Sequence, residues 1–111
     1  MIFIEHRRNR IADLNGIPAH HGVEIDVRSK GSELILAHDP FTPGDSLAAW
    51  LEQYRKLQIQ GPVILNTKED GLEEGLIQLF QKEGAPNFLF LDTTVPTFLR
   101  FYQKGLGSFF M

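Results

Sequence analysis

Short apolar runs recur along the chain, and glycine, proline, asparagine or charged residues separate them. The runs have the length of β-strands. Continuous apolar runs are typical of strands that are covered on both faces, as in parallel sheets. The pattern predicts strands at residues 2–4, 23–27, 34–37, 63–65, 88–91 and 108–111.

Helical periodicity fills the gaps between the later apolar runs. A helix capped by Asp45 or Ser46 is expected, because apolar residues then recur at the three- and four-residue spacing of one helix face. A second helix is expected at Asp70 and Glu73, whose spacing resembles a capping box, and a third after Thr94. The predicted inward residues are Leu47, Trp50, Leu51, Tyr54 and Leu57, then Leu72, Leu76, Leu79 and Phe80, then Phe98, Leu99 and Tyr102, with Gly105 ending the third helix.

The order of these elements predicts an α/β fold. From residue 45 onward helices and strands alternate, which indicates right-handed β-α-β units and a parallel sheet. Residues 8–21 are polar and carry two turn signals, so we expect a loop there with one helical turn around residues 11–14. A length of 111 residues is enough for one domain with one modest core.

Composition narrows the class of protein. The net charge is −3 and no basic block is present, so nucleic acid is not an expected partner. The chain has no cysteine, which excludes disulfides and thiolate metal sites. No apolar run approaches the roughly 18 residues of a membrane span. We therefore expect a soluble, cytoplasmic protein.

Ionisable side chains fall where the predicted strands end. Glu24 and Asp26 share one strand face, about 7 Å apart along the strand, and Asn66 and Lys68 alternate in the same way. The carboxyl ends of parallel strands are where α/β proteins build their sites. Three further residues end predicted strands: His6, His38 and Asp92.

These residue types suit metal-assisted acid–base chemistry. Two carboxylates on one face are able to hold a hard divalent ion such as Mg²⁺ or Ca²⁺, and a nearby histidine transfers protons at neutral pH. A structural interpretation stays open, in which Glu24 and Asp26 pair with Arg28, Arg7 or Lys68 in an ion-pair network.

Three stretches, EHRRN, VEIDVRSKGSELILAHDP and ILNTKE, together resemble the glycerophosphodiester phosphodiesterase family of phospholipase C-like phosphodiesterases. The middle stretch is the specific one, because an E-x-D strand is followed by His-Asp twelve residues after Asp26. The resemblance covers roughly residues 1–70. Asn66 stands where the family has an acid.

The resemblance implies a TIM-type (β/α)₈ barrel with a site at its C-terminal face that depends on Mg²⁺ or Ca²⁺. It implies phosphodiester hydrolysis, with the nucleophile either water or a hydroxyl of the substrate. By position, it implies that the general acid and base are His6 and His38, that Arg7 and Lys68 bind the phosphate of a small-molecule diester, and that Glu24, Asp26 and Asn66 ligate the metal ion.

The chain is short for such a barrel. Eight units take roughly 250 residues, so 111 residues supply the first three to four units. We therefore expect residues 1–111 to be the N-terminal part of the barrel, which a longer chain or a partner copy completes. Two further interpretations stay open: a non-catalytic relative that binds a phosphorylated metabolite or a metal, and another metal-using barrel such as a sugar isomerase.

Overall fold

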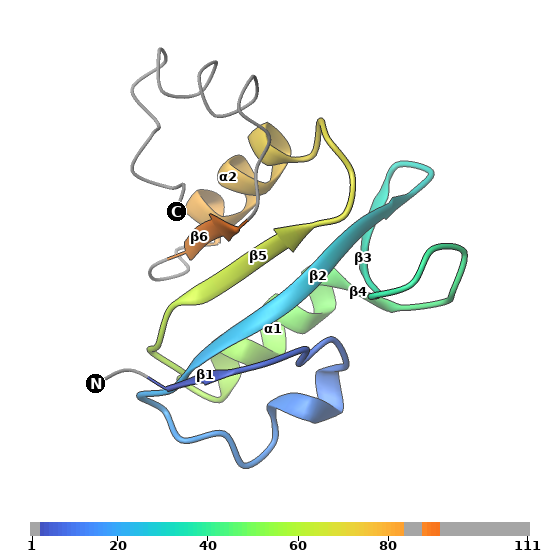
Figure 1. Cartoon of the computed structure of the whole chain (residues 1–111). Helices are drawn as coiled ribbons and strands as arrows, with labels where there is room; N and C mark the ends of the chain where they lie inside the picture. The colour runs from blue at the N-terminus through green and yellow to red at the C-terminus, as the bar shows by residue number, and fades with distance from the viewer. Residues whose placement is uncertain (1–2, 84–87, 92–111) are drawn as a thin grey trace.

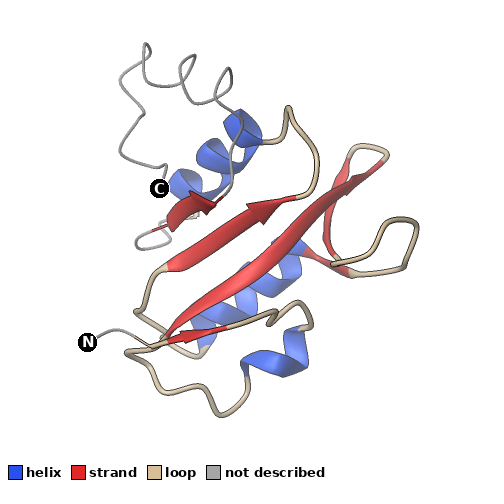
Figure 2. Cartoon of the chain, viewed as in Figure 1, coloured by secondary structure: helices blue, strands red, loops and turns tan. Residues whose placement is uncertain are grey.

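The computed structural model describes residues 3–83 and 88–91. In this part of the chain, one mixed sheet carries two α-helices (Figures 1 and 2). The fold class is α/β, as the alternation of elements predicts. The elements are β1 (Ile4–Glu5), the 3₁₀ helix η1 (Ile11–Leu14), β2 (Gly22–Lys30), β3 (Glu33–Leu36), β4 (Asp45–Ser46), α1 (Leu47–Lys56), β5 (Val63–Thr67), α2 (Glu73–Lys82) and β6 (Phe88–Leu91).

The sheet has the order β4-β3-β2-β5-β6, and β1 also pairs with β2. The pairs β1–β2, β2–β5 and β5–β6 are parallel, which confirms the predicted parallel units. Strand β3 runs antiparallel to β2, and β4 runs antiparallel to β3. The sheet formed by the described strands is open, so the structure shows an α/β sheet and not a closed barrel.

A tight hairpin sets the direction of β3. Lys30 pairs with Glu33 across a two-residue turn, and the first turn residue, Gly31, has φ +63°. A positive φ at this position is typical of tight β-hairpins. An arrangement in which every predicted strand is parallel is therefore wrong for residues 33–36, because the turn folds them straight back along β2.

The core lies between the helices and one face of the sheet. Alternate residues of β2, β5 and β6 join the buried side chains of α1 and α2 in one apolar cluster. Along β2 this alternation leaves Glu24 and Asp26 on the other face. The buried members from these elements are Val23, Ile25, Val27, Leu47, Trp50, Leu51, Tyr54, Val63, Leu65, Leu76, Ile77, Phe80, Phe88 and Phe90.

The helix boundaries confirm part of the prediction. Ser46 caps α1 by accepting a hydrogen bond from Ala49, but Leu57 lies beyond the helix and is 38% exposed. Helix α2 begins at Glu73, and Asp70 is not its cap because the chain turns at Gly71 with φ +96°. The predicted third helix and the strand at 108–111 lie outside the described residues.

Candidate functional site

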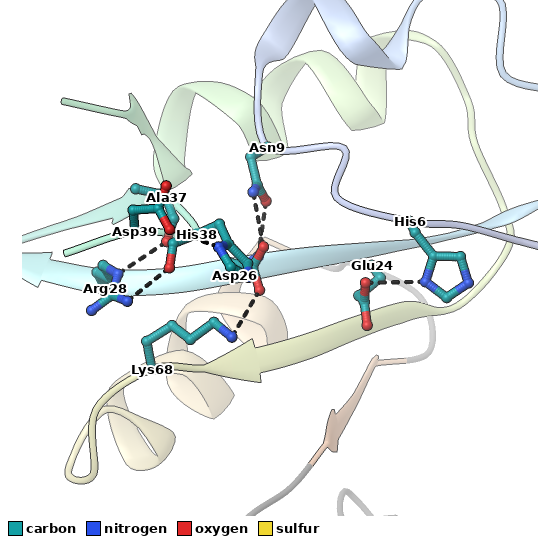
Figure 3. Close-up of polar contacts among 9 residues, drawn as sticks. All are labelled: His6, Asn9, Glu24, Asp26, Arg28, Ala37, His38, Asp39 and Lys68. Carbon is teal, nitrogen blue, oxygen red and sulfur yellow. Dashed lines mark hydrogen bonds and ion pairs between the residues drawn. The ribbon is translucent and has the colours of Figure 1, made fainter. Parts of the chain in front are cut away.

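Polar side chains line the face of β2 that the helices leave uncovered (Figure 3). Asn66 of β5 is the register partner of Asp26, so these two predicted ligands stand side by side on neighbouring strands. These side chains form a polar row along β2: Figure 3 shows His6 with Glu24 at one end, Asp26 in the middle and His38 at the other end. The parallel pairing of β2 with β5 thus assembles most of the predicted residues.

Asp26 is the buried centre of this row. Its side chain is 2% exposed, and the Lys68 ammonium lies 3.5 Å from Oδ1. On the other oxygen, Asn9 Nδ2 donates a hydrogen bond of 3.0 Å to Oδ2. A buried carboxylate needs such partners to offset its lost hydration. The contact with Lys68 is also one that the structural ion-pair interpretation predicts.

The predicted proton-transfer residue His6 is oriented by a predicted metal ligand. Its Nδ1 lies 3.1 Å from Glu24 Oε1. Because an ionised carboxylate only accepts hydrogen bonds, the contact places a proton on Nδ1. In the neutral ring Nε2 is then a proton acceptor, and the imidazole is 75% exposed. His6 is therefore accessible and held in one tautomer.

His38 lies beside the row although the strand before it, β3, is antiparallel to β2 and not parallel as the pattern suggests. Strand β3 returns along β2, and Ala37 N donates to Asp26 O at 3.1 Å. The Arg28 guanidinium then donates to the carbonyls of Ala37 and His38, at 3.1 and 2.8 Å. The hairpin and Arg28 together hold His38 beside Asp26.

The ring of His38 is oriented by the next residue in the chain. Its Nδ1 lies 3.0 Å from Asp39 Oδ1, and this hydrogen bond with the His38 charge holds the pKa of Asp39 below its usual value. The charges of Arg28 and Arg7 act in the same direction on the Asp39 pKa. Arg7 is exposed and has φ +52°.

Glu69, an acid just after β5, is engaged by Ser29 of β2. Glu69 accepts hydrogen bonds from Ser29 N at 2.9 Å and Ser29 Oγ at 2.6 Å, and these bonds hold its pKa below the usual value. Asp92, which ends a predicted strand, lies outside the described residues. Glu69 therefore ties the residues after β5 to β2.

Asn9 and a neighbouring pocket are features that the sequence did not predict. The pocket has a volume of about 500 Å³, and its lining includes Asn9, His38, Asp39 and Asp45. Asn9 ends the stretch EHRRN, but the sequence assigns it no role, because its place depends on the path of the loop after β1. The pocket also depends on loop geometry, since most of its lining comes from residues 36–45.

The donor set suits a hard divalent ion. Glu24, Asp26 and Asn66 offer carboxylate and amide oxygens, the ligands that Mg²⁺ and Ca²⁺ prefer. Among the described residues, Glu24 Oε2 has no hydrogen-bond partner. Residues 3–83 and 88–91 contain no cluster of three or more His, Cys, Asp or Glu side chains arranged around a metal position. An ion here would therefore need the Asn66 oxygen and water as further ligands.

Comparisons with protein-family models, curated proteins and solved structures find no match to this chain. Among the helices of the described residues, none is long and apolar enough to cross a membrane.

Proposed function

We propose that this chain contributes the site of a metal-dependent phosphodiester hydrolase similar to glycerophosphodiester phosphodiesterases. The observation that carries the proposal is the pairing of each histidine with a carboxylate on either side of Asp26: His6 with Glu24 and His38 with Asp39. Both contacts occupy Nδ1 and leave Nε2 for proton transfer.

The side chains divide the chemistry between them. Glu24, Asp26 and Asn66 would hold Mg²⁺ or Ca²⁺, which when bound supplies positive charge to the phosphate oxygens. Lys68 and Arg7 would bind the same oxygens and stabilise the charge that develops on attack at phosphorus. These five side chains are the residues that we propose to bind the ion and the phosphate.

Proton transfer belongs to the histidines. One imidazole takes a proton from the nucleophile through Nε2, and the other gives a proton to the leaving alkoxide. The nucleophile is water or a neighbouring hydroxyl of the substrate. The contacts with Glu24 and Asp39 stabilise the imidazolium that forms during the transfer.

A second candidate function is binding of a phosphorylated metabolite without turnover. Two observations favour it: Lys68 and Asn9 already partner Asp26, and Asn66 brings no negative charge to the ion. A site with two acids binds a divalent ion more weakly than a site with three, because less charge opposes the cost of dehydrating the ion.

The assembly of the sheet belongs to the same proposal. The parallel strands lie in the order β1-β2-β5-β6, which is their order along the chain, and both helices pack on one face. This is the arrangement of consecutive units in a (β/α)₈ barrel. We propose that further strands, from a longer chain or a second copy, close the sheet around the polar face.

Hydrolysis of an aryl phosphodiester with added Mg²⁺, Ca²⁺ or Mn²⁺ tests the enzyme proposal. We expect turnover that EDTA abolishes, and a loss of roughly 10²- to 10⁴-fold in His6→Ala and in His38→Ala. His20→Ala is the matched control, because His20 is exposed and has no assigned role in the site; its ring packs against that of His21. Turnover that survives both His6→Ala and His38→Ala would contradict the assigned roles.

Thermal unfolding with and without the ions separates the remaining possibilities. Stabilisation by an ion that Glu24→Ala removes, without turnover, would favour the binding function. If no divalent ion stabilises the wild type, the acids form only a structural ion-pair network.

A further inference from the structure

Asn9 makes two hydrogen bonds to the same residue. Its Oδ1 accepts from Asp26 N at 2.8 Å, and its Nδ2 donates to Asp26 Oδ2 at 3.0 Å (Figure 3). One amide therefore fixes both the backbone and the carboxylate of Asp26. Asparagine is suited to this double contact because it carries a donor and an acceptor on one short side chain.

The position of Asn9 fills a gap beside β2. The ladder with β1 joins Ile4–Glu5 to the start of β2, and the ladder with β3 begins only at Val27. Between them, Asp26 N has no strand to bond on that side. Asn9 supplies the missing acceptor, since a buried backbone N–H without a partner is costly.

The same loop carries His6 and Arg7, and further hydrogen bonds fasten it. Arg8 N donates to Glu24 O at 3.0 Å, and Trp50 Nε1 donates to Arg8 O at 2.9 Å. Of these loop residues, Asn9 is the one whose side chain bonds directly to the carboxylate of Asp26. Its two bonds couple the place of the loop to the orientation of the acid.

We propose that Asn9 is a positioning residue, which holds the Asp26 carboxylate and the loop bearing His6 and Arg7 in one arrangement. This inference rests on the proposed phosphodiesterase function. Catalytic groups must be held close to their productive geometry, and a displacement of about 1 Å costs on the order of 10² in rate. Asn9 acts through Asp26 and needs no contact with the substrate.

Asn9→Asp is the decisive single substitution. It keeps an acceptor for Asp26 N, removes the donor to Oδ2 and sets two carboxylates against each other. We expect kcat for an aryl phosphodiester to fall about 10- to 100-fold with KM changed less than threefold. Asn15→Asp is the matched control, because it makes the same chemical change at an exposed residue.

The exchange Asn9→Asp with Asp26→Asn separates positioning from packing. The exchanged pair restores a donor and an acceptor, so we expect the thermal midpoint lost in Asn9→Asp to return. Turnover stays low, because the carboxylate now stands at residue 9. If Asn9→Asp does not fold, Asn9→Ser, which adds no charge, takes its place in the comparison of kcat with KM.

The outcomes are distinct. If Asn9→Asp matches Asn15→Asp in kcat, or if the exchange restores full turnover, the positioning role is overturned. If the wild type has no turnover while the exchange restores the thermal midpoint, the proposed function fails and Asn9 is a structural clamp only.

Discussion

At the scale of single residues, burial decides how much a charge pair stabilises the fold. Asp26 is 2% exposed where Lys68 approaches it at 3.5 Å, whereas Lys56 and Glu52 pair at 3.3 Å with both side chains about two-thirds exposed. Water screens the second pair. The longer contact therefore matters more, because removing Lys68 leaves a buried carboxylate without its cation.

We expect Lys68→Met to lower the free energy of unfolding by about 2–3 kcal/mol and Lys56→Met to change it by less than about 0.5 kcal/mol. Urea unfolding of each variant measures both. Adding Asp26→Asn to Lys68→Met should recover part of the loss, because the double variant no longer buries an unpaired charge. Equal effects of the two lysine substitutions would contradict this view of Asp26.

Tyr54 gives a pH dependence at the alkaline end. Its phenol is buried against Trp50 and donates to Gly61 O, and burial raises its pKa from 10.0 to about 12. Between these values the unfolded chain loses the proton while the folded chain keeps it. Stability from this group is therefore present below pH 10.0 and is lost as the pH rises toward about 12.

We expect Tyr54→Phe to lower the free energy of unfolding by about 1–3 kcal/mol at neutral pH, because Gly61 O loses its donor. Above pH 10.0 the advantage of the wild type should shrink, by up to about 1.4 kcal/mol per pH unit. Urea unfolding of both proteins at neutral pH and near pH 11 gives the comparison. A difference that stays constant with pH would show that Tyr54 ionises freely in the folded chain.

At the scale of elements, the sequence predicts those features that depend on the alternation of side chains along a single strand or helix. The alternation along β2 places Glu24 and Asp26 on one face wherever the strand lies, so these candidates are predictable. The direction of β3 depends on the turn at Gly31, and a glycine–serine pair between apolar runs is a hairpin signal that the strand pattern alone overlooks. Asn9 was not predictable, because its contacts join segments far apart in the chain.

Gly61 lies where the backbone before β5 approaches the backbone before β2 too closely for a side chain. A Cβ there would lie 2.1 Å from the His21 carbonyl oxygen, at the point where the chain enters β5 beside the start of β2. We expect Gly61→Ala to lower the free energy of unfolding by about 3 kcal/mol or more.

Gly16→Ala is the control for that substitution. Gly16 has φ +81° but no atom within 4 Å of a built Cβ, so only backbone strain of about 1–2 kcal/mol is expected. Thermal or urea unfolding compares the two variants. A smaller loss in Gly61→Ala than in Gly16→Ala would mean that the start of β2 moves freely away from the turn.

At the scale of the whole molecule, one apolar cluster joins the helices and the longer strands of the described residues. It contains residues of β2, β5 and β6, of α1 and α2, and Leu14 of η1. The polar row depends on this cluster, because the packing of α1 and α2 on one face sets which residues of β2 and β5 stand on the other. A change that loosens the cluster should therefore displace the site as well.

We expect the described part of the chain to unfold as one cooperative unit. Trp50 is the only tryptophan, lies in α1 and bonds to the loop at Arg8, so its fluorescence reports on the core and on the site loop together. Circular dichroism reports on all helices and strands. The two urea transitions should coincide, because none of the described helices and strands has a core of its own.

Tyr54→Phe, which removes one buried hydrogen bond, should shift the midpoints of both the fluorescence and the circular dichroism transitions equally. A fluorescence transition that precedes the loss of helix signal would instead show that the loop with His6 and Asn9 separates from the sheet first, and that the geometry of the site is not tied to the global fold.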